Sequence, residues 1–436
     1  FGSSFGSSVV WVLAPGAHMV ELDEKAHGEE PVPKKAKLDE KAKPPNVEEF
    51  YSSEFLLRHI EDIMRFYKDR AVDGTGGYNQ SFYDDGTLFN TSFKQLVSSA
   101  RMVINFALAG KLLSRNDLLD IARHGLDYVE KVHWQPEGQL YAFTLRDHKP
   151  EDMAQQSYAY AFVLAMHAAA LKAGIHSDAS PIAKVFDLME QRFWLPEFEA
   201  YADTIVEGVM SSYRGQNSNM HICEAMIAAY EATKETRYLD RAKTLAVTFT
   251  QRQASKADGL IWEHYTEGWE IDWEYNKDDP KNLYRPWGFQ PGHQNEWAKN
   301  LLNIYRQAPE KWMLKKAREL FDRAYKTSWD DDHGGLIYGF GPDGKCCDDD
   351  KYFWVQAESF AAAAQLFQAT GDEAYREQYR ALWRYSWEHF VDHEHGAWWR
   401  ILRRDNTKYS NEKSAAGAKC DYHTLVSCVE ALKGFK

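Results

Sequence analysis

The chain of 436 residues contains only five cysteines, and their spacing shows no repeated pair. An odd number without paired spacing disfavours a disulfide framework, so we expect a reducing compartment and place the protein in the cytoplasm. The adjacent Cys346 and Cys347 precede three aspartates, but this spacing matches no familiar metal-ligand pattern and indicates an acidic surface turn. No apolar run approaches the roughly 20 residues that a membrane-spanning helix needs.

Basic residues are outnumbered, with 52 Lys and Arg against 65 Asp and Glu, which gives a formal net charge of −13. This balance argues against a nucleic-acid backbone or an anionic membrane as a partner. The chain also lacks a glycine loop for phosphate, a G-x-S-x-G turn and a Cys–His nucleophile signature. Several common enzyme classes are therefore disfavoured.

Aromatic residues, by contrast, are abundant at 14% of the chain, with 15 Trp and 24 Tyr. Most such rings fill a core, and a surplus suits a pocket that binds ring-shaped ligands.

Residues 1–47 differ in character, since a GSS…GAHM pattern typical of a vector-encoded tag is followed by a charged stretch that contains LDEKA twice. We expect this lead to be disordered and residues 48–436 to form one catalytic domain.

Short turns that combine glycine or small residues with aromatics recur along the predicted domain. They lie at 75–82, 137–143, 197–203, 258–265, 333–340 and 395–401. Pairs of helical stretches lie between them, such as an almost wholly apolar segment at 157–174 and an amphipathic one at 180–194. This periodicity predicts an all-α (α/α)6 barrel, with six helical hairpins in a double ring and short strands in the turns. An open solenoid is the alternative, but the inner helices are too apolar to face solvent.

Polar residues recur in step with the repeat, near the starts of the inner helices. His221 and Glu224 share an H-x-x-E spacing with His293 and Glu296, and the later repeats carry further polar or aromatic residues at matching points. These further residues are Trp354, Glu358 and His423, with Arg101 in an apolar helix upstream. Because helix starts converge at one end of a barrel, we expect a shared pocket there.

Histidine titrates near neutrality, and helix N-termini favour negative charge on a nearby oxygen. These residues therefore suit proton abstraction beside a carbonyl through an enediol-like intermediate, with Arg101 stabilising the oxyanion. Two other interpretations remain open. H-x-x-E places two potential metal ligands on one helical face, although Arg101 would repel a cation. The fold also accommodates glycosidases with paired carboxylates, although the residues in register are mostly histidines.

Several long segments resemble the N-acylglucosamine 2-epimerase superfamily, and most closely its bacterial mannose isomerase branch, over about residues 48 to 436. The segments are RGQNSNMH, DWEYNKDDPKNLYRPWGFQPGHQNEWAK, DKYFWVQAE, HGAWWRIL and DYH. The resemblance implies an (α/α)6 barrel with acid/base catalysis that needs neither metal nor cofactor. It implies that His293 and His423 are the acid/base pair and that His221 assists sugar binding and ring opening. The positions that line the sugar pocket in relatives are Arg101, Asn217, Glu296, Trp354 and Glu358.

The resulting hypothesis is an isomerase that interconverts D-mannose and D-fructose. His423 takes the C2 proton and returns it to C1, Arg101 stabilises the cis-enediol, and His293, oriented by Glu296, moves protons between the oxygens. A 2-epimerase acting on N-acylglucosamine, glucose or cellobiose is the main alternative, and a glycosidase or a non-catalytic sugar-binding protein is a remoter one. The expected partner is a monosaccharide, and the expected assembly is a monomer or homodimer.

Overall fold

Six buried helices form the inner ring of the computed structural model, which describes residues 46 and 48–434. Each inner helix packs against the next, and the last packs against the first, so the ring is closed. The inner helices are α2 (Leu96–Leu112), α4 (Ser157–Lys172), α6 (Gln216–Thr233), α8 (Pro291–Gln307), α10 (Phe353–Thr370) and α12 (Tyr422–Leu432).

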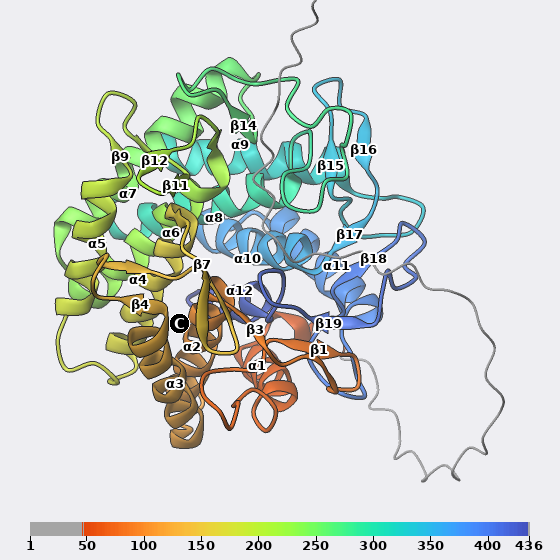
Figure 1. The fold of residues 1–436 in the computed structure, drawn as a ribbon. Coiled ribbons are helices and arrows are strands. Elements are labelled where there is room, and N and C mark those ends of the chain that lie inside the picture. The colour runs from red at the N-terminus through yellow and green to blue at the C-terminus, as the bar shows by residue number, and fades with distance from the viewer. Residues whose placement is uncertain (1–45, 47, 435–436) are drawn as a thin grey trace, which may run out of the picture. The chain divides into compact units, whose positions relative to one another are not determined.

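The other helices surround this ring (Figure 1). They are α1 (Ser53–Tyr67), α3 (Asn116–Tyr128), α5 (Ser180–Arg192), α7 (Thr236–Val247), α9 (Lys311–Ser328) and α11 (Glu373–His389). Five of them follow the inner helix on which they pack. The sixth pair joins the two ends of the domain, because α1 packs on α12. The first and last helices thus close both rings together.

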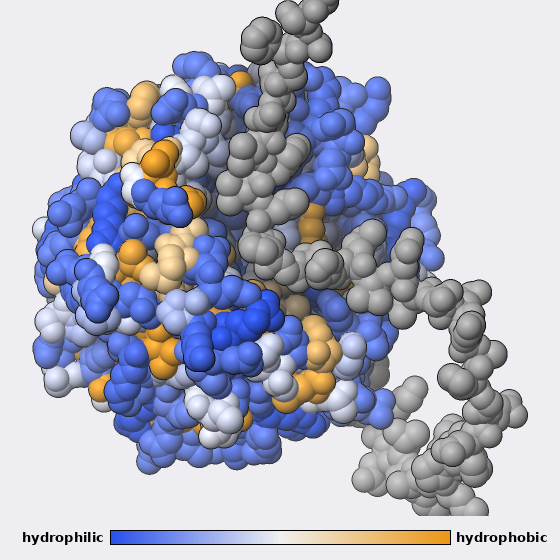
Figure 2. Space-filling view, in the orientation of Figure 1, coloured by the Kyte–Doolittle hydropathy of each residue, from blue (hydrophilic) through white to orange (hydrophobic). Residues whose placement is uncertain are grey.

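The burial of the two helix types explains why they take these places. In α4 only Tyr158, Leu171 and Lys172 are less than fully buried, so the helix is covered on every side. In α5 the fully buried positions, which include Ile182, Val185 and Met189, follow a helical period and leave the opposite face to solvent. On the face shown in Figure 2 hydrophilic residues predominate accordingly.

Short strands fasten the starts of the inner helices to the outer layer. The strands are β1 (Ser81–Tyr83), β2 (Leu88–Asn90), β3 (Phe93–Gln95), β4 (Trp134–Gln135), β5 (Leu140–Tyr141), β6 (Thr144–Arg146), β7 (Lys149–Asp152), β8 (Gln155–Gln156), β9 (Trp194–Leu195), β10 (Ala200–Tyr201), β11 (Thr204–Val206), β12 (Val209–Met210), β13 (Arg214–Gly215), β14 (His264–Tyr265), β15 (Gly339–Phe340), β16 (Cys346–Asp348), β17 (Lys351–Tyr352), β18 (Ile401–Leu402) and β19 (Glu412–Ser414).

The pairing of these strands repeats six times around the ring. Each strand that leads into an inner helix pairs antiparallel with the strand that follows its outer partner: β3 with β6, β8 with β11, β13 with β14, β17 with β18 and β19 with β1. Before α8 the same place is taken by a single bridge, between Phe289 and Phe340. All six inner helices therefore start at the same end of the barrel and at a similar level along its axis.

The predicted (α/α)6 architecture is confirmed. All five cysteines are free. Cys346 and Cys347 lie in strand β16 and not in the acidic surface turn expected there, and the buried Asp348 at the end of that strand pairs with Lys281, as do Asp349 and Asp350. Among the described residues, no helix combines the length and apolar character needed to cross a membrane. The predicted lead, residues 1–47, lies outside the described residues apart from Asn46.

Candidate active site

The polar residues predicted to meet lie in two layers at the starts of the inner helices. Asn217, Trp354 and His423 are each the second residue of their helix, as is Tyr158, which the sequence did not suggest, and His293 is the third. Arg101, His221, Glu296 and Glu358 are each the sixth residue, one turn deeper. Because these helices start at the same depth, equal positions form rings of side chains around the barrel axis.

His423 connects the two layers. Its Nδ1 lies 2.7 Å from Glu358 Oε1, and its Nε2 lies 3.4 Å from Arg101 Nη2. Burial, together with the guanidinium of Arg101, lowers the pKa of His423 well below its usual value, so the ring is neutral at neutral pH. With its Nδ1–H donated to the carboxylate, His423 carries its lone pair on Nε2, which accepts a long hydrogen bond from Arg101 and can take a proton from a ligand that replaces this contact.

His221 occupies the second layer beside two carboxyl groups. Its Nδ1 lies 3.2 Å from Glu224 and 3.5 Å from Glu296. Burial lowers the pKa of His221 to about 3, so this ring is also neutral. Burial and the nearby Glu358 raise the pKa of Glu296 well above its usual value, so this carboxyl group holds a proton to higher pH than an exposed glutamate.

His293, on the first turn of α8, is paired with a residue that the sequence did not suggest. Its Nδ1 lies 2.9 Å from Glu263 Oε2, whose oxygen also accepts an amide N–H of Gln216 at 2.9 Å. The indole of Trp297 donates to the Gln216 carbonyl oxygen at 2.7 Å. Since an indole only donates, this contact fixes the amide orientation and leaves Glu263 to accept from the His293 Nδ1–H.

The expectation that Glu296 orients His293 is therefore wrong. Both residues belong to α8, but Glu296 is directed one turn deeper, toward His221 and Lys299. The same H-x-x-E spacing gives a direct pair in α6, where His221 contacts Glu224. The spacing alone does not decide the pairing, because in α8 the preceding loop supplies a nearer carboxylate.

We predict that Glu263→Gln lowers kcat by roughly 10- to 100-fold, as loss of a group that orients a functional histidine does. The amide retains the shape of the side chain but no longer holds the Nδ1–H tautomer as a carboxylate does. Steady-state kinetics on the proposed substrate checks this. Glu267→Gln, in an exposed turn four residues on, is the matched control. Native kcat in Glu263→Gln would show that His293 needs no carboxylate.

Trp354 forms the wall between the two candidate acid/base histidines. Its ring centroid lies 4.9 Å from that of His293 and 5.8 Å from that of His423. A Cβ on Gly292 would lie 2.3 Å from the Trp354 ring, so the residue before His293 must be glycine for the indole to lie here. The segment FQPGH thus places an imidazole at the barrel mouth and leaves space for the indole beside it.

The guanidinium of Arg101 lies among aromatic rings. Its carbon is 4.2 Å from the centroid of Phe162, 5.1 Å from that of Tyr422 and 5.7 Å from that of Tyr158, whose hydroxyl accepts from Nη2 at 2.7 Å. In the part of the chain that the structure describes, several buried polar atoms near these residues have no protein hydrogen bond. They include Arg101 Nε, Asn217 Oδ1, Glu263 Oε1 and both oxygens of Glu296. Such groups suit a polyhydroxyl ligand.

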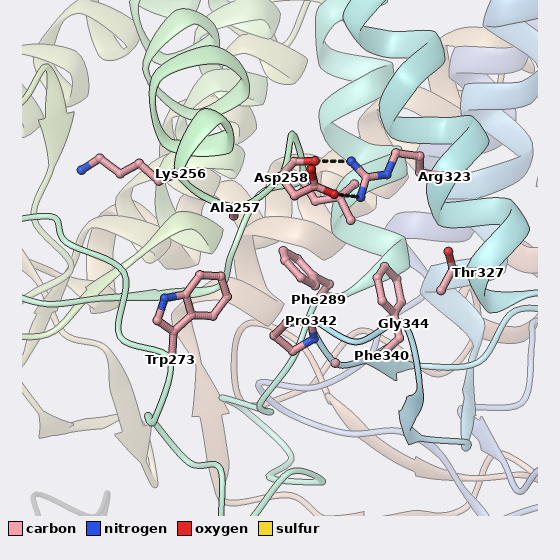
Figure 3. Close-up of a pocket in the computed structure, with 12 residues that line it drawn as sticks. Lys256, Ala257, Asp258, Trp273, Phe289, Arg323, Thr327, Phe340, Pro342 and Gly344 are labelled. Atoms are coloured by element: carbon pink, nitrogen blue, oxygen red, sulfur yellow. Dashed lines mark hydrogen bonds and ion pairs between the residues drawn. The ribbon is translucent and has the colours of Figure 1, made fainter.

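One cavity elsewhere on the domain is lined by none of these residues. It has a volume of about 270 Å³ and is lined partly by Trp273, Phe289 and Phe340 (Figure 3). Its arginine, Arg323, is already paired with Asp258 at 2.9 Å. The predicted residues thus converge at the barrel axis and not at this cavity.

Sequence reasoning missed three contributors to the site. Tyr158 is in step with Asn217 and Trp354, and Lys299 lies on the same face of α8 as Glu296, three residues on, so the helical register could have found both. Glu263 belongs to a loop and carries no periodic signal.

Comparison with known proteins identifies the family and the fold. The family model of N-acylglucosamine 2-epimerase matches residues 76–427. A D-mannose isomerase from Marinomonas mediterranea is 48% identical over 387 residues, which cover 88% of this chain and 98% of that protein. A crystal structure of a D-mannose isomerase, also 48% identical, superposes with a TM-score of 0.86 over 88% of this chain and 98% of that one. A cellobiose 2-epimerase structure from Spirochaeta thermophila, 21% identical with a TM-score of 0.78, shares the fold; it covers 89% of this chain and 97% of that one.

The fold and the site together define a class of (α/α)6-barrel proteins with neutral histidines and buried carboxyl groups at the axis. Within that class, the chain belongs to the N-acylglucosamine 2-epimerase family.

Proposed function

We propose that this protein is an aldose–ketose isomerase that interconverts D-mannose and D-fructose. The observation that carries the proposal is the pair formed by His423 and Glu358, which leaves the imidazole lone pair on Nε2, where it accepts from the Arg101 guanidinium at 3.4 Å. A base beside a fixed cation suits removal of a proton from a carbon next to a carbonyl. The 48% identity to a D-mannose isomerase along almost its whole length supports this substrate.

In the proposed mechanism, His221 assists opening of the mannose ring. His423 Nε2 removes the C2 proton, and the electron pair forms the C1–C2 double bond of a cis-enediol whose oxygen Arg101 stabilises. His293, held by Glu263, transfers a proton between O2 and O1. His423 then returns its proton to C1 on the same face, which gives fructose. Asn217 and Trp354 position the sugar.

We propose that the reaction needs no metal ion. Two groups of side chains at the axis have the composition of a metal site: His221, Glu224 and Glu296, and Glu296, Glu358 and His423. The ammonium of Lys299, however, lies among these carboxyl groups, 2.5 Å from Glu358 and 3.1 Å from Glu224. A lysine in this position supplies the positive charge that a divalent ion would supply.

The cytoplasmic location and the monomeric or dimeric state stay predictions of the sequence.

Incubation with D-mannose in deuterated water, followed by NMR, tests the function. Fructose formation is the expected result, with some deuterium at C1 where the base exchanges its proton with solvent. Glucose as the sole product would contradict the isomerase and favour the 2-epimerase, in which a second base delivers a proton to the opposite face of C2. Release of reducing sugar from a glycoside, or mannose binding without exchange at C2, would favour the glycosidase or the binding protein.

A further inference from the structure

Lys299 is a fully enclosed charge at the barrel axis. Its side chain is fully buried on α8, and its ammonium contacts carboxyl groups from three helices. The nitrogen lies 2.5 Å from Glu358 Oε2 on α10, 3.1 Å from Glu224 Oε1 on α6 and 4.0 Å from Glu296 Oε1 on its own helix. Burial of an ammonium is costly unless it is fully paired, and this set of partners meets that condition.

The same two carboxylates hold the histidines. Glu358 contacts Lys299 through Oε2 and His423 Nδ1 through Oε1, at 2.7 Å. Glu224 contacts Lys299 through Oε1 and His221 Nδ1 through Oε2, at 3.2 Å. Lys299 is thus the centre of two carboxylate–histidine pairs and touches neither imidazole through a hydrogen bond.

We infer that Lys299 is a positioning residue, which keeps Glu358 and Glu224 ionised and so fixes His423 and His221 as Nδ1–H tautomers with the lone pair on Nε2. This inference rests on the proposed function, in which His423 Nε2 is the base. Lys299 acts through these carboxylates and does not itself touch the sugar.

Lys299 supplies positive charge to two buried carboxylates at once. Burial raises the pKa of Glu358, and Lys299 opposes the rise; burial would also raise the pKa of Glu224, but Lys299 and His221 outweigh it and lower that pKa. Lys299 contacts both carboxylates directly, and Arg101, the second cation at the axis, lies beside His423. The groups around Glu358 are Lys299 and Glu296 on α8, Glu224 and His221 on α6, and His423 on α12. Arg101 on α2 contacts the far side of His423.

Loss of the ammonium would leave two carboxylates with one cation, and a proton would replace the missing charge. Once protonated, Glu358 donates its O–H to His423 Nδ1. The imidazole hydrogen then lies on Nε2, where the lone pair is needed, and the base is lost. The proton on Glu358 leaves again as the pH rises, which restores the active tautomer.

The test uses Lys299→Met, which keeps the length of the side chain without its charge. We expect kcat at neutral pH to fall about 100-fold with little change in KM, since the affected group acts on the proton and not on binding. The acid limb of the kcat–pH profile is expected to move to higher pH, because activity then requires an ionised Glu358. A lysine that only stabilises the fold would leave that limb in place.

The matched control is Lys413→Met. Lys413 is equally buried and is paired with Asp392, but it belongs to β19, outside the site. We expect it to lose stability while its kcat stays within about threefold of the native value. Lys299→Ala provides a rescue experiment, since a cavity of about 70 Å³ adjoins Glu224. Methylammonium is expected to raise its kcat in a saturable way, and tetramethylammonium, which has no N–H, is not.

A measurement on the native protein separates failure of this inference from failure of the proposed function. Histidine ¹⁵N NMR reports the tautomer without any turnover. It is expected to show His423 with hydrogen on Nδ1 in the native protein and on Nε2 in Lys299→Met. Hydrogen on Nε2 in the native protein would overturn the inference, whatever the activity, and so would a Lys299→Met variant with native kcat and pH profile. Absence of native isomerase activity with the expected tautomers would instead count against the function.

Discussion

His423→Ala is expected to lower kcat for mannose isomerisation by about 10²- to 10⁴-fold, the contribution usual for a general base that acts on carbon. Exchange of the C2 proton with solvent should fall by the same factor, because the two processes share their first step. Both rates are measured in one NMR experiment with mannose in deuterated water. His423→Asn, which keeps a polar group beside Glu358, provides a second variant if the alanine protein is unstable.

The matched control is His167→Ala. His167 is also a buried histidine on an inner helix, but its contacts are Glu130 at 3.2 Å and His176 at 2.9 Å, outside the site. We expect this variant to retain native kcat. The comparison with His293→Ala then separates the two roles: loss of His293 should slow product formation more than C2 exchange. If His293→Ala abolished exchange and His423→Ala retained it, the carbon base would be His293.

The part of the site that the sequence predicted is the part fixed by helical register. Arg101, His221, Glu296 and Glu358 are each the sixth residue of their helix. Six repeats start their inner helices at one depth, because a short strand or bridge fastens each start to the outer layer. Residues at equal positions then meet at the axis, and this can be predicted without knowing the side-chain geometry. The six-fold periodicity is visible in the Gly-aromatic turns.

The part that the sequence did not predict concerns which side chain pairs with which. His293 has Glu296 three residues away on its own helix, yet it pairs with Glu263 from a loop. The choice depends on distances of an ångström or less between elements far apart in the chain, and periodicity carries no information about these. The sequence also did not predict the burial of Lys299. A lysine in a helix usually faces solvent, but this one is fully buried.

Arg101→Met is expected to lower kcat by about 10²- to 10³-fold, as removal of one oxyanion-stabilising donor does. Methionine retains the contacts with Phe162, Tyr422 and Tyr158 but supplies no charge to the developing enediolate. Because Arg101 helps lower the pKa of His423, its loss raises that pKa. His423 must be neutral to accept a proton, so the acid limb of the pH profile should move to higher pH.

Arg101→Lys separates charge from geometry. A lysine ammonium keeps the positive charge near His423 and should leave the acid limb close to its native position. It lacks the planar fork that reaches Tyr158 and the ligand at once, so kcat is expected to recover only partly. Tyr158→Phe, which removes the hydroxyl alone, is expected to cost less than about tenfold. If Arg101→Met raised KM and left kcat unchanged, Arg101 would only bind the sugar, and the enediolate would need another source of stabilisation.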